Sequence, residues 1–175
     1  MITIIADEVA KELGQEMYGR ISSVRKDVRH FNLENMDIEP CYACRGCEEK
    51  TNGRCVVRDG ADLLLPCLSR SKVIIVLTPV VFGGYSFKVK RALDKLGLIT
   101  SKHYSYYKGE LRKGTPSGTK YYVIGINDNI GHEEISVFKK LVFETQRIVA
   151  WLGKAIILPN DCDDYDNLMQ EVLAL

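Results

Sequence analysis

The amino-acid sequence predicts an α/β fold in which one parallel sheet carries helices on both faces. Short apolar runs rich in β-branched residues alternate with amphipathic segments, as in successive strand–helix–strand units. The run at residues 73–77 is apolar at every position, as expected of a central parallel strand buried on both faces. A chain of 175 residues with 46% hydrophobic residues can form its own core. We therefore expect a single domain over residues 1–175.

Five strands are expected from the short apolar runs, which are rich in β-branched and aromatic residues. In chain order they are residues 2–5, 28–33, 73–77, 121–126 and 155–158. The second run alternates only partly between apolar and polar residues. Thr78 and Pro79 are expected to end the third strand.

The first two helices are expected on either side of a cysteine-rich segment. In residues 7–18, Val9, Leu13 and Met17 recur every four residues and would share one helix face. Asp59 or Asp62 can cap the second helix through its carboxylate. The apolar positions of this second helix are Leu63, Leu64, Cys67 and Leu68.

The remaining helices are expected at residues 87–96, 131–152 and 163–173. The helix at 131–152 has the clearest apolar stripe, which consists of Ile135, Phe138, Leu141, Val142, Thr145, Ile148 and Leu152. Glu133 and Glu134 suit its positive N-terminal end. Gly153 is expected to end it, since glycine adopts the left-handed conformation that terminates many helices.

Strands and helices in this alternation fit a flavodoxin-like three-layer sandwich with a five-stranded parallel sheet in the order 2-1-3-4-5. Ligands of such sheets bind beyond the carboxyl ends of the strands, at the switch point between the first and third strands. The segments that follow the second, third and fourth strands all open onto this edge. We therefore expect the functional residues to lie in these three segments.

The second strand leads into a loop with four of the six cysteines, expected at residues 40–58. Cys41, Cys44, Cys47 and Cys55 have the spacing C-x2-C-x2-C-x7-C. Thiols at steps of three residues cannot share one regular helix or strand face, which indicates a loop wrapped around one centre. Four thiolates bind [4Fe–4S] clusters in such compact runs. Zinc also takes four thiolates, more often from two separated pairs, so a zinc site or an empty motif remains the alternative.

The other composition signals exclude several classes of function. A net charge of +1 favours neither a nucleic-acid partner nor a membrane surface. The first residues lack the basic segment and long apolar run of a signal peptide or membrane span. We expect a cytoplasmic protein, where clustered cysteines bind metals more often than they form disulfides. Cys67 and Cys162 stand alone and are expected to be small buried apolar side chains.

Residues 98–120 are long for a connection and mix tyrosines with basic residues. Such a segment could stack on nucleic acid, but one short patch on a nearly neutral chain favours a lid or a subunit contact. We therefore expect a homo-oligomer, either a dimer or a tetramer.

Together these motifs resemble a known family, the flavodoxin-like NAD(P)H-dependent FMN reductases. The resemblance rests on Cys41, Cys44, Cys47, Gly53, Arg54, Cys55, Asp59, Thr78, Pro79, Val80, Val81, Phe82, Gly83, Lys90 and Asp94. Within the family, the chain is most similar to the iron–sulfur flavoproteins over residues 40–97. The resemblance implies an oligomer with FMN and a [4Fe–4S] cluster on the four cysteines. It also implies electron transfer from a redox partner such as a ferredoxin or a nicotinamide nucleotide.

The resemblance places the FMN ring on the loop after the third strand. The residues implied there are Thr78, Pro79, Val80, Val81, Phe82 and Gly83. The residues alone favour an ordinary connection with Phe82 in the core. Asn127 and Asn129 follow the fourth strand and would either touch the ring or cap the next helix, with capping favoured by the residues alone.

The family holds the FMN phosphate on a loop rich in glycine and serine after the first strand, and this chain departs from that pattern. Here Ile5 is followed directly by Ala6, Asp7 and Glu8. Two carboxylates beside a helix N-terminus would repel a phosphate, so we expect weak FMN binding. The alternative function is a non-catalytic, cofactor-poor binding or regulatory subunit.

Overall fold

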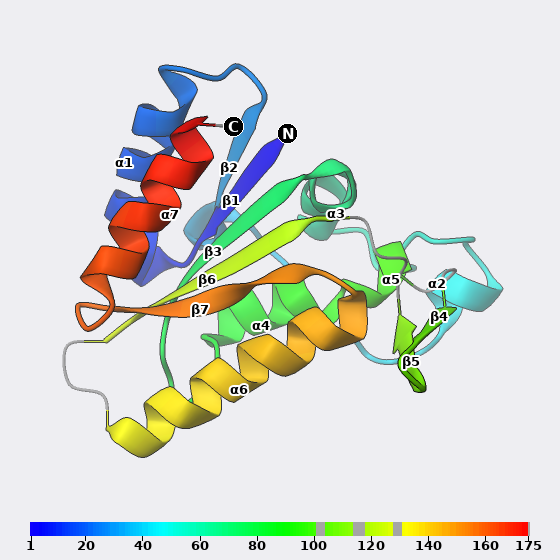
Figure 1. Ribbon diagram of the computed structural model, residues 1–175. Helices are drawn as coiled ribbons and strands as arrows, with labels where there is room; N and C mark the ends of the chain where they lie inside the picture. The colour runs from blue at the N-terminus through cyan, green and yellow to red at the C-terminus, as the bar shows by residue number, and fades with distance from the viewer. Residues whose placement is uncertain (101–103, 114–117, 128–130, 175) are drawn as a thin grey trace.

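A computed structural model describes residues 1–100, 104–113, 118–127 and 131–174, and it shows the expected sheet (Figure 1). All five strands of the sheet run parallel, in the order β2-β1-β3-β6-β7. They are β1 (Ile2–Ala6), β2 (Val28–Asn32), β3 (Val73–Pro79), β6 (Lys120–Ile126) and β7 (Leu152–Leu158). Since β4 and β5 lie outside this sheet, its order is the predicted 2-1-3-4-5, with β3 in the centre.

Helices cover both faces of the sheet, which gives the three layers seen in Figure 1. One face carries α1 (Lys11–Ser22) and α7 (Cys162–Ala174). The opposite face carries α3 (Ala61–Arg70), α4 (Phe87–Asp94) and α6 (His132–Val149). The short helices are η1 (Glu8–Ala10), η2 (Leu33–Asn35), α2 (Gly46–Glu49) and α5 (Gly97–Thr100). None of the described helices combines the length and hydropathy needed to span a membrane.

The sheet divides the core in two because successive side chains of a strand point to opposite faces. Ile2 and Ile4 of β1 pack in the cluster that includes α1 and α7. Ile5 packs in the cluster that includes α3, α4 and α6. Every residue of β1 is buried, as are all residues of β3 except the last. This burial explains why the β3 sequence lacks the polar alternation of a half-exposed strand.

The first helix differs from the prediction in its start and in its buried face. Asp7 accepts a hydrogen bond from the Val9 amide, which caps the short η1 turn, and α1 then begins at Lys11. Val9 is consequently 69% exposed, whereas Met17 is buried. The predicted stripe of Val9, Leu13 and Met17 is therefore wrong at its first member, because the turn changes the helical phase.

The long helix α6 ends earlier than predicted. Ala150 adopts the left-handed conformation at φ 56°, so the helix stops at Val149. Gly153 instead lies in β7, where an added Cβ would be 1.9 Å from the carbonyl oxygen of Tyr121. Ile148 and Leu152 were expected on the buried stripe but are exposed. Glycine is needed here for the close approach of two strands and not for helix termination.

The segment at residues 98–120, predicted to be a lid or a subunit contact, contains an antiparallel hairpin of β4 (Tyr104–Tyr107) and β5 (Glu110–Lys113). Two further expectations are corrected by the structure. Leu63 is exposed on α3. Cys67 is only half-buried, and Cys162 is exposed at the start of α7, where its thiol donates to the carbonyl of Pro159.

At Gly14, α1 packs closely against the sheet. An added Cβ would lie 2.7 Å from the Cβ of Ala6 and 2.8 Å from Nε2 of His30. Alanine improves helix propensity by about 1 kcal/mol, but overpacking costs about 1–3 kcal/mol. We expect Gly14→Ala to lower the free energy of unfolding in urea. Gly19→Ala is the control, with open space around its Cβ, and equal stability of the two variants would contradict this packing.

Candidate functional site

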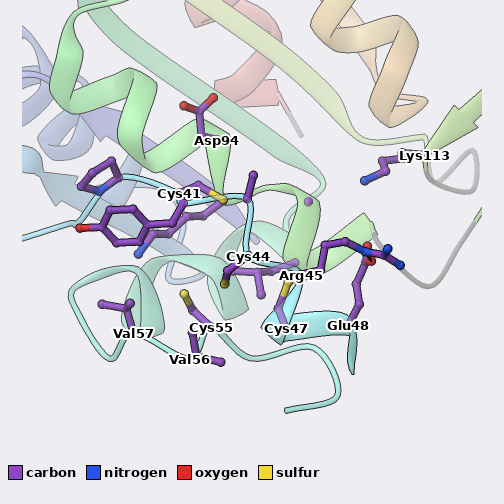
Figure 2. Close-up of a pocket in the computed structure, with 16 residues that line it drawn as sticks. Cys41, Cys44, Arg45, Cys47, Glu48, Cys55, Val56, Val57, Asp94 and Lys113 are labelled. Carbon is purple, nitrogen blue, oxygen red and sulfur yellow. Dashed lines mark hydrogen bonds and ion pairs between the residues drawn. The ribbon is translucent and has the colours of Figure 1, made fainter. Parts of the chain in front are cut away.

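The four clustered cysteines line one cavity, shown in Figure 2. Cys41, Cys44, Cys47 and Cys55 all border this space, which has a volume of about 260 Å³. Cys41 and Cys44 are exposed, and Cys47 and Cys55 are half-buried. The structure thus brings all four predicted metal ligands to one place beside the sheet.

Two features of the backbone turn the thiols toward this cavity. Ala43 and Arg45 both have positive φ, at 51° and 57°, so the backbone turns sharply between successive cysteines. Farther along, the Gly53 amide donates to the Cys47 carbonyl at 2.7 Å, which joins the two arms of the loop. Gly46 permits the Val56 side chain to pack against the first arm, because an added Cβ would lie 2.6 Å from Cγ1 of Val56.

The donor set suits a metal centre that prefers sulfur, such as an iron–sulfur cluster or zinc. Across the described ranges, however, no three histidine, cysteine or acidic side chains stand close enough to hold an ion as they are. Metal binding would therefore draw the thiols together. Burial raises the pKa of the Cys47 thiol, and nearby Glu48, Cys41 and Cys55 raise it further. Cys47 is thus protonated at neutral pH without metal and would release its proton on binding.

Much of the positive charge near the thiols is already paired. Arg45 lies 3.4 Å from Glu48 and 3.5 Å from Glu49, both in α2. Lys113 of β5 also lines the cavity, with its ammonium 5.9 Å from the ring centroid of Tyr104. The hairpin therefore lies beside the cysteine loop and brings a cation to the cavity wall (Figure 2).

The residues predicted to contact a flavin ring lie at the carboxyl edge of the sheet, where Thr78 and Pro79 end β3 and the others form the turn that follows. Thr78 and Val80 are buried, whereas Phe82 at the tip of the loop is 93% exposed. Val81 and Gly84 exchange backbone hydrogen bonds at 3.0 and 2.9 Å, which fixes the turn. The expectation of an ordinary connection with Phe82 in the core is therefore wrong. The loop instead presents an aromatic face to its surroundings.

Asn127, at the end of β6, lies beside this loop. Its side-chain amide donates to the Val80 carbonyl at 3.3 Å, and its backbone amide donates to Leu158. The start of α6 is capped instead by Glu134, whose carboxylate accepts from the Gly131 amide. Asn127 thus holds the loop after β3 in place and does not cap this helix. Asn129 lies outside the described residues.

The carboxyl end of β1 is closed by a carboxylate of the chain itself. Asp7 is buried, and it accepts hydrogen bonds from the Val9 amide at 3.1 Å and from the Ser86 hydroxyl at 2.6 Å. Glu8 beside it pairs with Lys88, and this hydrogen bond lowers the pKa of Glu8. At the helix N-terminus that would receive a phosphate, a carboxylate of the chain therefore already accepts the Val9 amide.

Ser86 is a site residue that the sequence interpretation missed. Its hydroxyl accepts from the Val89 amide and so caps α4, while it donates to Asp7. The Ser86 amide in turn donates to the Thr78 hydroxyl at 3.0 Å. A serine directly before an apolar helical segment is a known capping signal and would have indicated the first of these contacts.

Comparison of the sequence with known protein families identifies one family to which the chain belongs. A family model described as NADPH-dependent FMN reductase matches residues 3–118, which is more than half of the chain and includes the cysteine loop and the loop after β3. The chain belongs to this family. Its C-terminal part, with α6, β7 and α7, lies outside the matched range.

Two curated proteins are similar to this chain in sequence, and both are named iron–sulfur flavoproteins. That of Archaeoglobus fulgidus is 25% identical over 117 residues, covering 67% of this chain and 55% of the relative. That of Methanocaldococcus jannaschii is 29% identical over 83 residues, covering 47% of this chain and 42% of the relative. The chain thus spans about half the length of these relatives.

Solved structures share the fold of this FMN reductase family member. An FMN-dependent NADH-azoreductase from Bacillus anthracis, solved with FMN, has a TM-score of 0.64 at 13% identity, with 99% and 97% of the two chains covered. Two-electron reduced flavodoxin from Megasphaera elsdenii has a TM-score of 0.53 at 13% identity over the full length of both chains. At such identities the likeness extends to the flavodoxin-like fold alone.

Proposed function

We propose that this member of the FMN reductase family is an oxidoreductase that uses a flavin together with a [4Fe–4S] cluster held by Cys41, Cys44, Cys47 and Cys55. The observation that carries the proposal is the cavity lined by all four thiols. The compact spacing favours a cluster over zinc. The similarity to iron–sulfur flavoproteins supports the same choice. The electron donor would be a reduced carrier such as a ferredoxin, or a nicotinamide nucleotide.

The protein's residues bind and orient the cofactors, and the cofactors supply the electron-transfer chemistry when bound. The four thiolates would hold the cluster. The loop of Thr78, Pro79, Val80, Val81, Phe82 and Gly83 would hold the flavin ring, with Asn127 keeping this loop in register with β6. Phe82 offers its exposed face, and Gly83 allows the turn at φ 72°. The proposal assigns no acid–base step to a side chain.

The phosphate end of FMN fits this chain poorly. The buried Asp7 carboxylate lies where a phosphate would seek amide donors, and its own hydrogen bonds occupy the donors nearby. We therefore propose that the flavin is held mainly by its ring and that FMN binds weakly. The same observation favours a second candidate function, a cofactor-poor regulatory or binding subunit of another flavoprotein.

The visible absorption spectrum of protein purified without oxygen distinguishes the two functions. A broad iron–sulfur absorption, together with flavin bands after addition of excess flavin, is the expected result. A colourless protein that binds neither iron nor flavin would refute the oxidoreductase and favour the subunit role.

We also propose that the protein is a homo-oligomer that buries the hairpin. Tyr106 is 78% exposed, and Tyr104 and Leu111 are exposed as well. Light scattering at micromolar concentration should give a dimer or a tetramer. Tyr106→Glu combined with Leu111→Glu should yield the monomer, because a buried unpaired carboxylate is costly. Val24→Glu, at an exposed apolar site far along the chain, is the control, and a monomeric wild-type protein would contradict the proposal.

A further inference from the structure

A buried ion pair lies at the base of the cysteine loop. Lys95 follows α4 directly, and its side chain is only 1% exposed. It donates to Oδ2 of Asp59, whose side chain is 5% exposed. Burial of two charges is unfavourable unless each is well paired and hydrogen-bonded. Such a pair therefore requires a reason beyond ordinary packing.

The Asp59 carboxylate joins the two ends of the loop. Oδ2 also accepts from the Glu39 amide at 2.9 Å, immediately before the loop. Oδ1 accepts from the Ala61 amide at 2.9 Å, immediately after the loop. Burial raises the pKa of Asp59, but the hydrogen bonds from Lys95, Ala61 and Glu39 lower it by more, so the carboxyl is charged at neutral pH.

Lys95 also borders the cavity that the thiols line. Cys41, Cys44, Cys47 and Cys55 share this cavity with Asp94 and Lys95. One wall of the cavity is formed by the end of α4, and another by the cysteine loop. The ion pair between Lys95 and Asp59 therefore connects α4 to both ends of this loop. Closing a loop of this length by a fixed contact at its base reduces the number of arrangements that its thiols can take.

We propose that Lys95 is a positioning residue of the cysteine centre, which acts through Asp59 to hold the four thiols around one cavity before any metal binds. The inference rests on the proposed function, since it assumes that the cysteines bind metal. Groups that orient metal ligands without touching the metal typically change metal affinity by about 10–100-fold when they are removed.

The test titrates reduced, metal-free whole protein with Co²⁺ in competition with a chromophoric chelator. Lys95→Met keeps an unbranched side chain of similar length and removes its charge. We expect a folded Lys95→Met protein to bind Co²⁺ about 10-fold or more weakly, with weaker thiolate-to-cobalt absorption. Lys90→Met is the matched control, because Lys90 forms an ion pair with Asp94 in the same helix but is exposed, and it should behave as wild type.

Unchanged Co²⁺ affinity in folded Lys95→Met would overturn the role of Lys95 and leave the metal centre standing. Failure of the wild-type protein to bind Co²⁺ would instead refute the centre itself, and with it the proposed function. If Lys95→Met does not fold, amide hydrogen exchange of the metal-free wild-type protein tests whether Asp59 holds the two ends of the loop together. Protection of the Glu39 and Ala61 amides supports the clamp, and exchange as fast as in an unstructured loop overturns it.

Discussion

Replacement of Cys44 by serine is expected to abolish cluster binding. Wild-type protein reconstituted with iron and sulfide in the absence of oxygen should hold about four of each per chain, the composition of a cubane cluster on four thiolates. Cys44→Ser removes one of the thiols that line the cavity, and a hydroxyl is a far poorer ligand for iron. Iron and acid-labile sulfide analysis, together with the visible spectrum, measures the loss.

Cys67→Ser and Cys162→Ser are the matched controls, because neither residue lines the cysteine cavity. Both variants should retain the full iron and sulfide content. If the wild-type protein instead contains one zinc ion per chain and no sulfide, the cluster assignment is wrong, but the four cysteines still form a metal site. Iron that remains in Cys44→Ser at wild-type content would show that Cys44 is not a ligand.

Replacement of Asp7 by serine is expected to tighten FMN binding by orders of magnitude. The substitution removes the carboxylate at the carboxyl end of β1, so the Val9 amide and the Ser86 hydroxyl that Asp7 now occupies become available to a phosphate. Each charge-assisted hydrogen bond that a phosphate gains is worth about 1.5–3 kcal/mol, so two such bonds amount to about 100-fold or more. Insertion of a Gly-Ser-Pro-Arg segment after Ile5 should act in the same direction, because it adds amide donors.

Quenching of flavin fluorescence gives the affinity for FMN and, as a phosphate-free comparison, for riboflavin. Asp7→Ser should leave riboflavin affinity unchanged, since only the phosphate of FMN would lie near residue 7. Glu8→Gln is the control, because Glu8 is exposed and already paired with Lys88, and it should change FMN affinity far less. Nanomolar affinity of the unmodified protein for FMN would contradict this explanation and would mean that other residues bind the phosphate.

The sheet could be predicted from the sequence because its signals are local. The fully apolar β3 run and the alternation of strands with helices lead to one topology, and right-handed crossovers leave few alternatives. The elements that went wrong were decided by contacts beyond the local pattern. The Asp7 carboxylate caps a separate short turn before α1, which leaves Val9 exposed to solvent. Ala150 adopts the left-handed conformation and ends α6 before Gly153, where the helix was expected to end.

The candidate site was foreseeable in part. The cysteine spacing alone indicated a loop around one centre, and the structure places all four thiols around one cavity. The supporting contacts were not foreseeable, because their partners are distant in the chain. Lys95 meets Asp59 across 36 residues, and Ser86 meets Asp7 across 79. The exposure of Phe82 likewise depends on the turn between Val81 and Gly84 and not on its hydropathy.

The hydrogen bond between Ser86 and Asp7 has a consequence for the order of events in folding. It joins the end of β1 to the start of α4, so it can form only when β1, β3 and α4 have come together. Contacts between distant residues require loop closure first and tend to form late. Interactions absent from the folding transition state act on the unfolding rate. We therefore expect this bond to slow unfolding of the native state and to contribute little to the rate of folding.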